Sequence, residues 1–204
     1  VAAAADKPAY IVESGPAAGV IGAARLASAD NNITLDMGGT TAKASMVEGG
    51  RIARTGDYEV GAGINLSSKL VMGGGYALKL PVIDISEIGA GGGSIVTLDR
   101  GGLLKVGPES AGALPGPVCY GRGGESPTFT DSALALGFLN PGHLIGGDLK
   151  LDADLARKVL QDKIATPLDR DLLDAAWGVY QVACGTMVRA VKAVSTYRGR
   201  DPRD

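Results

Sequence analysis

The chain has 204 residues, with 20 Lys and Arg against 22 Asp and Glu, and a formal net charge of -2. This balance provides neither the basic surface typical of nucleic-acid-binding proteins nor a charge block for a membrane surface, so we expect neither partner. No apolar run approaches the roughly 20 residues of a membrane span. The 2 cysteines are too few for a disulfide framework or a zinc site. These features predict a cytoplasmic protein with a real hydrophobic core.

The first predicted elements are a short strand over 10–12 and a helix over 14–27. Pro16 stands at the first helical position, where its missing N–H is tolerated. The small residues that follow it would let the helix lie close against a sheet. An exposed N-terminus of this helix would bind an anion, but a capped helix that only packs explains the same residues.

The centre of the chain is a predicted hairpin with strands over 33–35 and 42–47. Its first strand ends in a carboxylate, and its turn combines two glycines with two hydroxyls. Such a turn offers backbone N–H groups and hydroxyls to a phosphate, and the acid is placed to hold a metal-bound water. An ordinary hairpin turn explains the same glycine pair. The residues concerned are Asp36, Gly38, Gly39, Thr40 and Thr41.

Further strands are predicted over 51–60, 78–85, 95–98 and 103–106, while the glycine-rich stretch 61–75 has no clear assignment. Another glycine-rich segment follows two acids, Asp84 and Glu87. It consists of Gly89, Ala90, Gly91, Gly92, Gly93 and Ser94. Glycines in such a run indicate a close approach of the backbone, either to another backbone or to a ligand.

Residues 107–124 contain too many glycines and prolines for a regular element, so a long functional loop is predicted there. Cys119 is a poor candidate nucleophile because His143, the only histidine, is not near it in the sequence. Three helices are predicted to follow, over 130–139, 153–163 and 169–198. Thr130 and Asp131 would begin the first, and the last has one apolar face suited to core packing.

Six motifs in this chain occur in the same order in the hydantoinase A/5-oxoprolinase family, which the chain resembles over nearly its whole length. They are Glu-Ser-Gly-Pro-Ala-Ala-Gly at 13–19, Asp-Met-Gly-Gly-Thr-Thr at 36–41, Gly-Ala-Gly-Gly-Gly-Ser-Ile at 89–95, Ser-Ala-Gly through Pro-Gly-Pro at 110–117, Cys-Tyr-Gly-Arg-Gly-Gly at 119–124 and Arg-Gly-Arg-Asp-Pro at 198–202.

The resemblance implies an α/β domain of the actin, sugar-kinase and Hsp70-like ATPase fold, one half of a two-domain nucleotide cleft. Residues 1–204 would be the central domain of a longer chain, inactive alone. The implied enzyme uses ATP and magnesium to open cyclic amides such as hydantoin or 5-oxoproline through carbonyl phosphorylation. Its implied partners are the N-terminal half of the same chain and a hydantoinase B-type subunit or domain.

The resemblance assigns catalysis to Asp36, Asp84 and Glu87, with Asp36 also at the metal. Nucleotide binding falls to Gly38, Gly39, Thr40, Thr41, Gly91, Gly92, Gly93 and Ser94. Two positions depart from the family pattern: Ser86 stands where many members have His, and Lys43 stands where an acid is common. An acetone-type carboxylase subunit and a non-catalytic scaffold remain alternatives. The presence of a first Asp-x-Gly-Gly-Thr loop in the full chain would discriminate between enzyme and scaffold.

Overall fold

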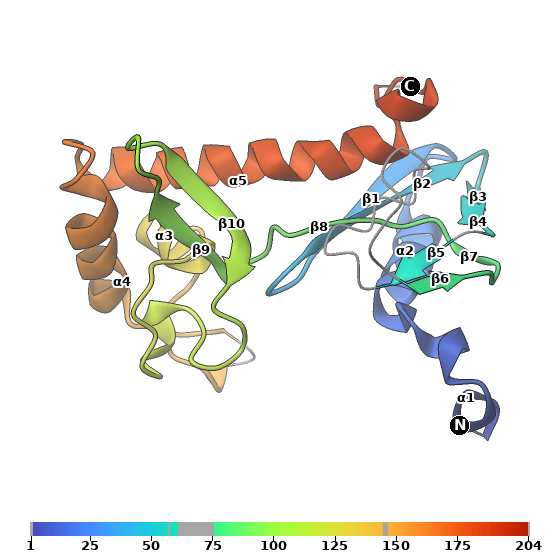
Figure 1. Ribbon diagram of the computed structural model, residues 1–204, viewed down its shortest axis with the longest axis horizontal. Helices are drawn as coiled ribbons and strands as arrows, with labels where there is room; N and C mark the ends of the chain where they lie inside the picture. Colours follow the sequence, from blue (N-terminus) through green and yellow to red (C-terminus); the bar gives the residue numbers. More distant parts are fainter. Residues whose placement is uncertain (1, 57, 61–75, 145–146, 204) are drawn as a thin grey trace. The chain divides into compact units, whose positions relative to one another are not determined.

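Figure 1 shows the computed structural model, which describes residues 2–56, 58–60, 76–144 and 147–203. The glycine-rich stretch 61–75, unassigned from the sequence, lies outside the described residues. The chain divides into two compact units. The first comprises Val1–Asp36, Ala42–Ile88 and Val188–Asp204, and the second comprises Met37–Thr41 and Gly89–Met187.

The first unit is built on a 4-stranded sheet (Figure 1). β1 (Asn32–Met37) and β2 (Ala42–Glu48) form the predicted central hairpin. β2 also pairs antiparallel with β3 (Arg51–Ile52) and with β8 (Ser86–Ile88). The predicted first helix is α2 (Ser14–Leu26), which contacts β2 and β3. The hairpin and this helix are therefore confirmed, but the helix begins at Ser14, so Pro16 is its third residue and not its first, as predicted.

The two long strands predicted after the central hairpin are wrong in extent, because each is broken into shorter pieces. β4 (Arg54–Thr55) pairs with β7 (Val82–Ile83), and β5 (Tyr58–Val60) pairs with β6 (Tyr76–Leu78). Pro81 precedes β7 and has no N–H to donate to a ladder, so it separates β6 from β7. The sequence pattern did not predict β8, which follows directly in the chain.

The strand predicted over 10–12 is wrong as well. Pro8–Ile11 form a 3-10 turn instead, after the short helix α1 (Ala2–Asp6). The fixed φ of proline suits the first residue of a helical turn. Tyr10 and Ile11 are exposed, so no strand ladder buries this apolar run.

The second unit combines an antiparallel hairpin, β9 (Ser94–Leu98) and β10 (Leu104–Ser110), with α3 (Phe129–Ala135) and α4 (Ala153–Leu160) (Figure 1). β10 extends into the segment predicted to be an irregular loop, so that prediction is wrong at its start. The ladder tolerates this extension through an irregularity near Gly107, whose φ of 68° suits glycine. Helix α4 is close to its predicted extent.

Asp131 is a fully buried carboxylate that fixes the loop preceding α3. Its oxygens accept hydrogen bonds from the N–H of Val118 (3.2 Å), from the N–H of Cys119 (2.7 Å), and from both the N–H and the hydroxyl of Thr128 (2.8 Å each). Thr128 is the N-cap, so the helix start predicted at Thr130 is slightly late. The prediction of Asp131 as a first-turn acid is confirmed, and the same carboxylate orders the loop.

The longest helix, α5 (Leu172–Val194), confirms the predicted core-packing helix. A 3-10 turn (Thr196–Arg198) follows it, so the helix ends earlier than predicted and Tyr197 is exposed. Its buried side chains are those of Ala175, Ala176, Val179, Ala183, Met187, Ala190, Ala193 and Val194. None of the helices in the described part of the chain is long and apolar enough to cross a membrane.

Candidate functional site

The turn at residues 38–41 lies in the second unit and is closed by its own backbone, since the N–H of Gly38 donates to the carbonyl of Thr41 (2.9 Å). Gly38, Gly39 and Thr40 are exposed. Within the described ranges, no acceptor takes a hydrogen bond from the N–H of Gly39 or Thr40. The turn therefore presents two consecutive backbone donors that a ligand can use.

The glycine-rich segment 91–94, after β8, binds the carbonyl groups of this turn and is called the supporting segment below. The N–H of Gly92 donates to the carbonyl of Gly38 (3.0 Å), and the N–H of Gly93 donates to the carbonyl of Gly39 (2.6 Å). In a trans peptide, the carbonyl of one residue and the N–H of the next point in opposite directions. Fixing these two carbonyls therefore aims the N–H groups of Gly39 and Thr40 away from the supporting segment.

This contact requires glycine in the supporting segment. A Cβ built on Gly91 would lie 2.6 Å from the backbone C and N of Thr40, and one on Gly92 would lie 2.9 Å from Oγ1 of Thr130. Thr130 in turn donates its N–H (2.8 Å) and its hydroxyl (2.7 Å) to the carbonyl of Gly92. At Gly91, the close approach predicted from the sequence is therefore an approach to another backbone.

The amides of the supporting segment are already used within the protein. The N–H of Gly91 donates to Oγ of Ser94 (2.8 Å), and the N–H of Ser94 donates to the carbonyl of Gly91 (3.1 Å). Together with the bonds from Gly92 and Gly93, these contacts leave no amide of the four residues for a phosphate. Direct nucleotide binding by Gly91, Gly92, Gly93 and Ser94 remains a prediction, while their support of the turn is visible in the structure.

Asp36 lies in β1, within the first unit, and is exposed. Its carboxylate has no hydrogen bond or ion pair to another described residue. A Cβ built on Gly19 would lie 3.7 Å from Oδ2 of Asp36, an ordinary contact distance, so α2 lies beside the carboxylate without crowding it. An exposed carboxylate of this kind suits Mg²⁺, which commonly binds one or two carboxylates together with phosphate oxygens and water.

Asp84, predicted to be catalytic, is 5% exposed and forms an ion pair with Arg198 of the first unit. Both guanidinium NH groups reach the carboxylate, and Nε of Arg198 donates to the carbonyl of Ala193 (3.0 Å). The backbone of Asp84 is also bound, because Ser45 donates its hydroxyl to the Asp84 carbonyl (2.8 Å). This pair fastens the segment after α5 to the sheet of the first unit.

Glu87, also predicted to be catalytic, pairs with Lys43 at 3.1 Å. The two residues face each other in the ladder between β2 and β8, so the unusual Lys43 has a cross-strand partner. Ser86, which stands where many members of the family have His, is fully buried. Its hydroxyl has no hydrogen-bond partner among the residues described. No group of three or more His, Cys, Asp or Glu side chains suited to a metal occurs in the described part of the chain.

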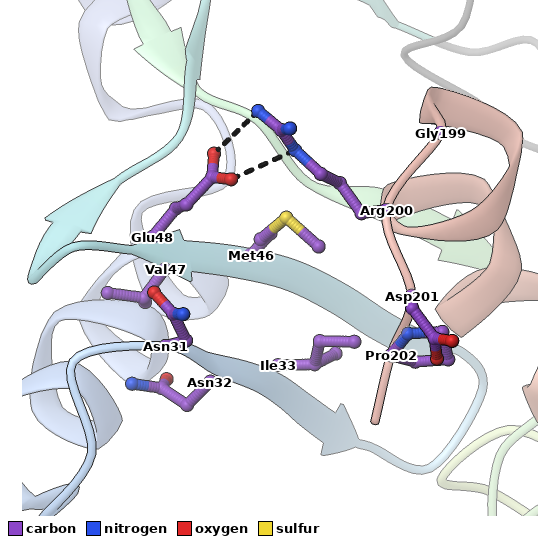
Figure 2. Close-up of a pocket in the computed structure, with 10 residues that line it drawn as sticks. All are labelled: Asn31, Asn32, Ile33, Met46, Val47, Glu48, Gly199, Arg200, Asp201 and Pro202. Atoms are coloured by element: carbon purple, nitrogen blue, oxygen red, sulfur yellow. Dashed lines mark hydrogen bonds and ion pairs between the residues drawn. The ribbon is translucent and has the colours of Figure 1, made fainter. Parts of the chain in front are cut away.

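Figure 2 shows a separate pocket of about 260 Å³ in the first unit, at the start of β1 and the end of β2. Arg200 crosses its rim to Glu48, with nitrogen–oxygen distances of 2.9 and 3.2 Å. Asp36 lies toward the opposite end of β1, so its carboxylate does not line this pocket. The pocket is lined by Asn31, Asn32, Ile33, Met46, Val47, Glu48, Gly199, Arg200, Asp201 and Pro202.

Cys119 is fully buried beside Asp131, as expected for a residue that is not a nucleophile. Burial raises the pKa of its thiol well above the usual range, and the negative charge of Asp131 raises it further. A thiol in these surroundings stays protonated and inert. Its role is to fill the core of the second unit, where it clusters with Leu134, Leu151 and Ala156.

Comparison with known proteins decides the family. The model of the hydantoinase/oxoprolinase family matches residues 1–204. The chain belongs to the hydantoinase/oxoprolinase family. An uncharacterized protein of Methanocaldococcus jannaschii is 46% identical over 98% of this chain and 30% of its own length. Caprolactamase subunit alpha of Pseudomonas jessenii is 43% identical over 86% of this chain and 23% of its own length.

Solved structures of family members share the fold. The crystal structure of ATP-dependent caprolactamase from Pseudomonas jessenii superposes with a TM-score of 0.72 at 42% identity, over 93% of this chain and 26% of that one. The nucleotide-free structure of acetone carboxylase, an enzyme of ATP-dependent acetone carboxylation, superposes with a TM-score of 0.76 at 30% identity. The match covers 93% of this chain and 25% of that one. The mixed α/β class is thereby confirmed, consistent with an actin-like ATPase fold. The chain spans about a quarter of the length of these structures.

Two hydroxyls beside the turn were not predicted as site residues. Oγ of Ser110 lies 3.4 Å from Oγ1 of Thr40, and Thr130 binds the carbonyl of Gly92 as described above. Ser110 belongs to the family motif at 110–117, which was the only sequence signal for it. Its segment was predicted to be an irregular loop, so no register indicated which side chain would reach the turn.

Proposed function

We propose that this chain is part of a longer ATP-dependent enzyme that opens cyclic amides, and that the turn at 38–41 binds a phosphate group of ATP. The observation that carries the proposal is the pair of N–H groups on Gly39 and Thr40, fixed in direction by Gly92 and Gly93 and used by no described residue. Successive backbone N–H groups that point outward from a turn form an anion-binding concavity.

The residues of the turn divide the work of binding. The N–H groups of Gly39 and Thr40 would donate to phosphate oxygens, and the hydroxyl of Thr40 would add a third donor. Thr41 closes the turn through its carbonyl, which accepts from Gly38. In this proposal the glycines at 91–93 act through the turn rather than on the nucleotide, because they set the direction of its amides.

Asp36, two residues before the turn in the chain, would hold the magnesium ion. The fit rests on its exposed carboxylate, which has no partner among the described residues. Since no cluster of three metal-ligating side chains occurs among the described residues, the remaining ligands would be phosphate oxygens and water. A bound magnesium ion would neutralise charge on the phosphates during transfer.

The reaction class follows from the relatives. A caprolactamase, by its name, acts on a cyclic amide, and the solved structure is of an ATP-dependent enzyme. Transfer of the terminal phosphoryl group of ATP to the amide carbonyl oxygen would release ADP and make the carbonyl carbon more electrophilic. Water would then add to this carbon, the ring C–N bond would break to leave an amine and an acyl phosphate, and a second water would release inorganic phosphate. Asp84 and Glu87 are held in ion pairs with Arg198 and Lys43, whereas Asp36 has no partner among the described residues, so among the predicted acids the proposal rests on Asp36.

An acetone-type carboxylase subunit is the second candidate, because the acetone carboxylase structure superposes with the higher TM-score, 0.76 against 0.72. Identity favours the amide hydrolase, 42% against 30%. Some relatives are named as subunits, and we include in the proposal the N-terminal half of the same chain and a hydantoinase B-type subunit or domain as partners. ATP turnover of the complete protein stimulated by a lactam, hydantoin or 5-oxoproline supports the hydrolase, whereas stimulation by a ketone with bicarbonate supports the carboxylase.

The decisive test is Asp36→Asn in the full-length protein. We expect ATP turnover to fall by on the order of a hundredfold, as it does when a group that positions metal or nucleophile is lost. Thermal stability should hardly change, because the carboxylate is exposed and has no described partner. Asp30→Asn, at an exposed acid six residues earlier in the chain, is the matched control. Equal turnover in the two variants would remove Asp36 from the mechanism.

A further inference from the structure

Ser110 ends β10 in the second unit and brings a hydroxyl to the turn at 38–41. Its Oγ lies 3.4 Å from Oγ1 of Thr40 and accepts a hydrogen bond from the N–H of Gly112 (3.1 Å). A Cβ built on Gly93 would lie only 2.9 Å from this Oγ. Glycine at position 93 is therefore required for Ser110 to come this close.

The hydrogen-bonding capacity of Ser110 is only partly used. A hydroxyl has one hydrogen to donate and two lone pairs to accept. The N–H of Gly112 occupies one lone pair of Ser110, which leaves the hydrogen available. The separation of 3.4 Å from Thr40 exceeds the usual range of about 2.5–3.0 Å for an O–H···O bond. The two hydroxyls therefore satisfy each other poorly, yet an oxygen at about 2.7 Å from each would accept from both.

Ser110 is held in the same frame as the turn. It pairs with Ser94 in the ladder between β9 and β10, and the following N–H, of Ala111, donates to the carbonyl of Gly93 (2.8 Å). The N–H of Gly93 is bound to the carbonyl of Gly39, as described above. One residue of the supporting segment thus anchors both the turn and the Ser110 strand, so the two hydroxyls are fixed relative to each other.

We propose that Ser110 is a further phosphate ligand, whose hydroxyl donates to the same phosphate oxygen as the hydroxyl of Thr40. The ligand class is a polyphosphate chain, as in a nucleoside triphosphate. This inference rests on the proposed function, because it requires a phosphate at the turn. It adds a side chain from β10 to a site otherwise built from backbone N–H groups and Thr40.

The test compares Ser110→Ala and Ser110→Thr in the full-length protein, by titration with magnesium-ATP and with magnesium tripolyphosphate. Removal of a hydrogen bond to a charged group typically weakens binding by about tenfold or more, and we expect this for both ligands with Ser110→Ala. Ser110→Thr keeps the hydroxyl and should bind both within about threefold of wild type. Thr97→Ala, at an exposed position of β9, is the matched control and should behave as wild type.

Each result is decisive. Wild-type affinity of Ser110→Ala for tripolyphosphate overturns the inference, since no phosphate contact was then lost. An equal loss in Ser110→Ala and Ser110→Thr also overturns it, because the hydroxyl is then not the cause. If the wild-type protein binds neither ligand, the proposed function of the turn itself fails. A selective loss in Ser110→Ala, restored in Ser110→Thr, supports Ser110 as a ligand.

Discussion

Gly91→Ala is the sharpest test of how the turn at 38–41 is supported. The new Cβ would lie 2.6 Å from the backbone C and N of Thr40 and 2.7 Å from the backbone C of Gly39, whereas ordinary contacts begin at 3.4 Å. The obstacle is backbone, so no side chain can rotate away. The turn and the supporting segment must therefore separate by about 0.8 Å at this point.

The cost follows from the hydrogen bonds across this contact. A separation of this size would strain the bonds from Gly92 to the carbonyl of Gly38 (3.0 Å) and from Gly93 to the carbonyl of Gly39 (2.6 Å). A backbone hydrogen bond contributes about 0.5–1.5 kcal/mol, and overpacking costs about 1–3 kcal/mol. We expect Gly91→Ala to lower the free energy of unfolding by about 2–4 kcal/mol.

The measurements are urea unfolding of residues 1–204, followed by circular dichroism, and the ATP affinity of the full-length protein. ATP should bind at least about tenfold more weakly in Gly91→Ala, because the amides of Gly39 and Thr40 lose their fixed direction. Gly185→Ala is the control, since a Cβ there meets nothing within 4 Å. That helix position should gain up to about 1 kcal/mol in stability. If Gly91→Ala matches this control in both measurements, the turn is not seated on the glycine-rich segment.

Two further predictions concern residues whose place the structure reveals. Arg198→Ala removes the guanidinium bound to the buried carboxylate of Asp84 and should lower the free energy of unfolding by about 2 kcal/mol. The control Arg203→Ala, whose pair with Asp201 is exposed, should lower it by less than about 0.5 kcal/mol. Equal urea midpoints in the two variants would contradict the structural role of Arg198. Because its pKa is raised in the folded protein, Cys119 has less thiolate at about pH 8 than in the unfolded chain, so iodoacetamide should label it only after urea unfolding, as peptide mass spectrometry would show. Equal labelling rates in the native and unfolded chain would contradict the burial of the Cys119 thiol.

Strong local signals predicted the elements of the fold well, and tertiary contacts decided the rest. Apolar periodicity located α5, and the Ser-Gly-Pro start located α2. β8 is too short for such a signal and forms because β2 offers it an edge, with Lys43 facing Glu87. β10 continues past Gly107 although Gly-Pro usually marks a break, because the β9 ladder accommodates the irregularity.

The predictions for the candidate site were likewise right where the pattern is local in sequence, and incomplete where tertiary contacts decide. Asp36 and the Gly-Gly-Thr-Thr turn are adjacent in sequence, so their pattern could be recognised from the chain alone. The sequence could not decide between backbone and ligand as the neighbour of Gly91, since both require the absence of a Cβ. The catalytic prediction for Asp84 and Glu87 came from the family resemblance. Their partners, Arg198 and Lys43, are distant in sequence or on another strand, so only the fold reveals the ion pairs.

The structure also shows what the glycine-rich segment at 91–94 contributes to the turn that we propose to bind phosphate. A turn with exposed glycines is free to rotate its peptide planes, and a ligand would have to order them on binding. Here the amides of Gly92 and Gly93 hold the carbonyls of Gly38 and Gly39, so the opposite N–H groups are aimed before any ligand arrives. The hydroxyl of Thr130 donates to the carbonyl of Gly92, so the start of α3 helps to fix the position of this segment. A substitution in the supporting segment should therefore weaken phosphate binding without any contact to the phosphate.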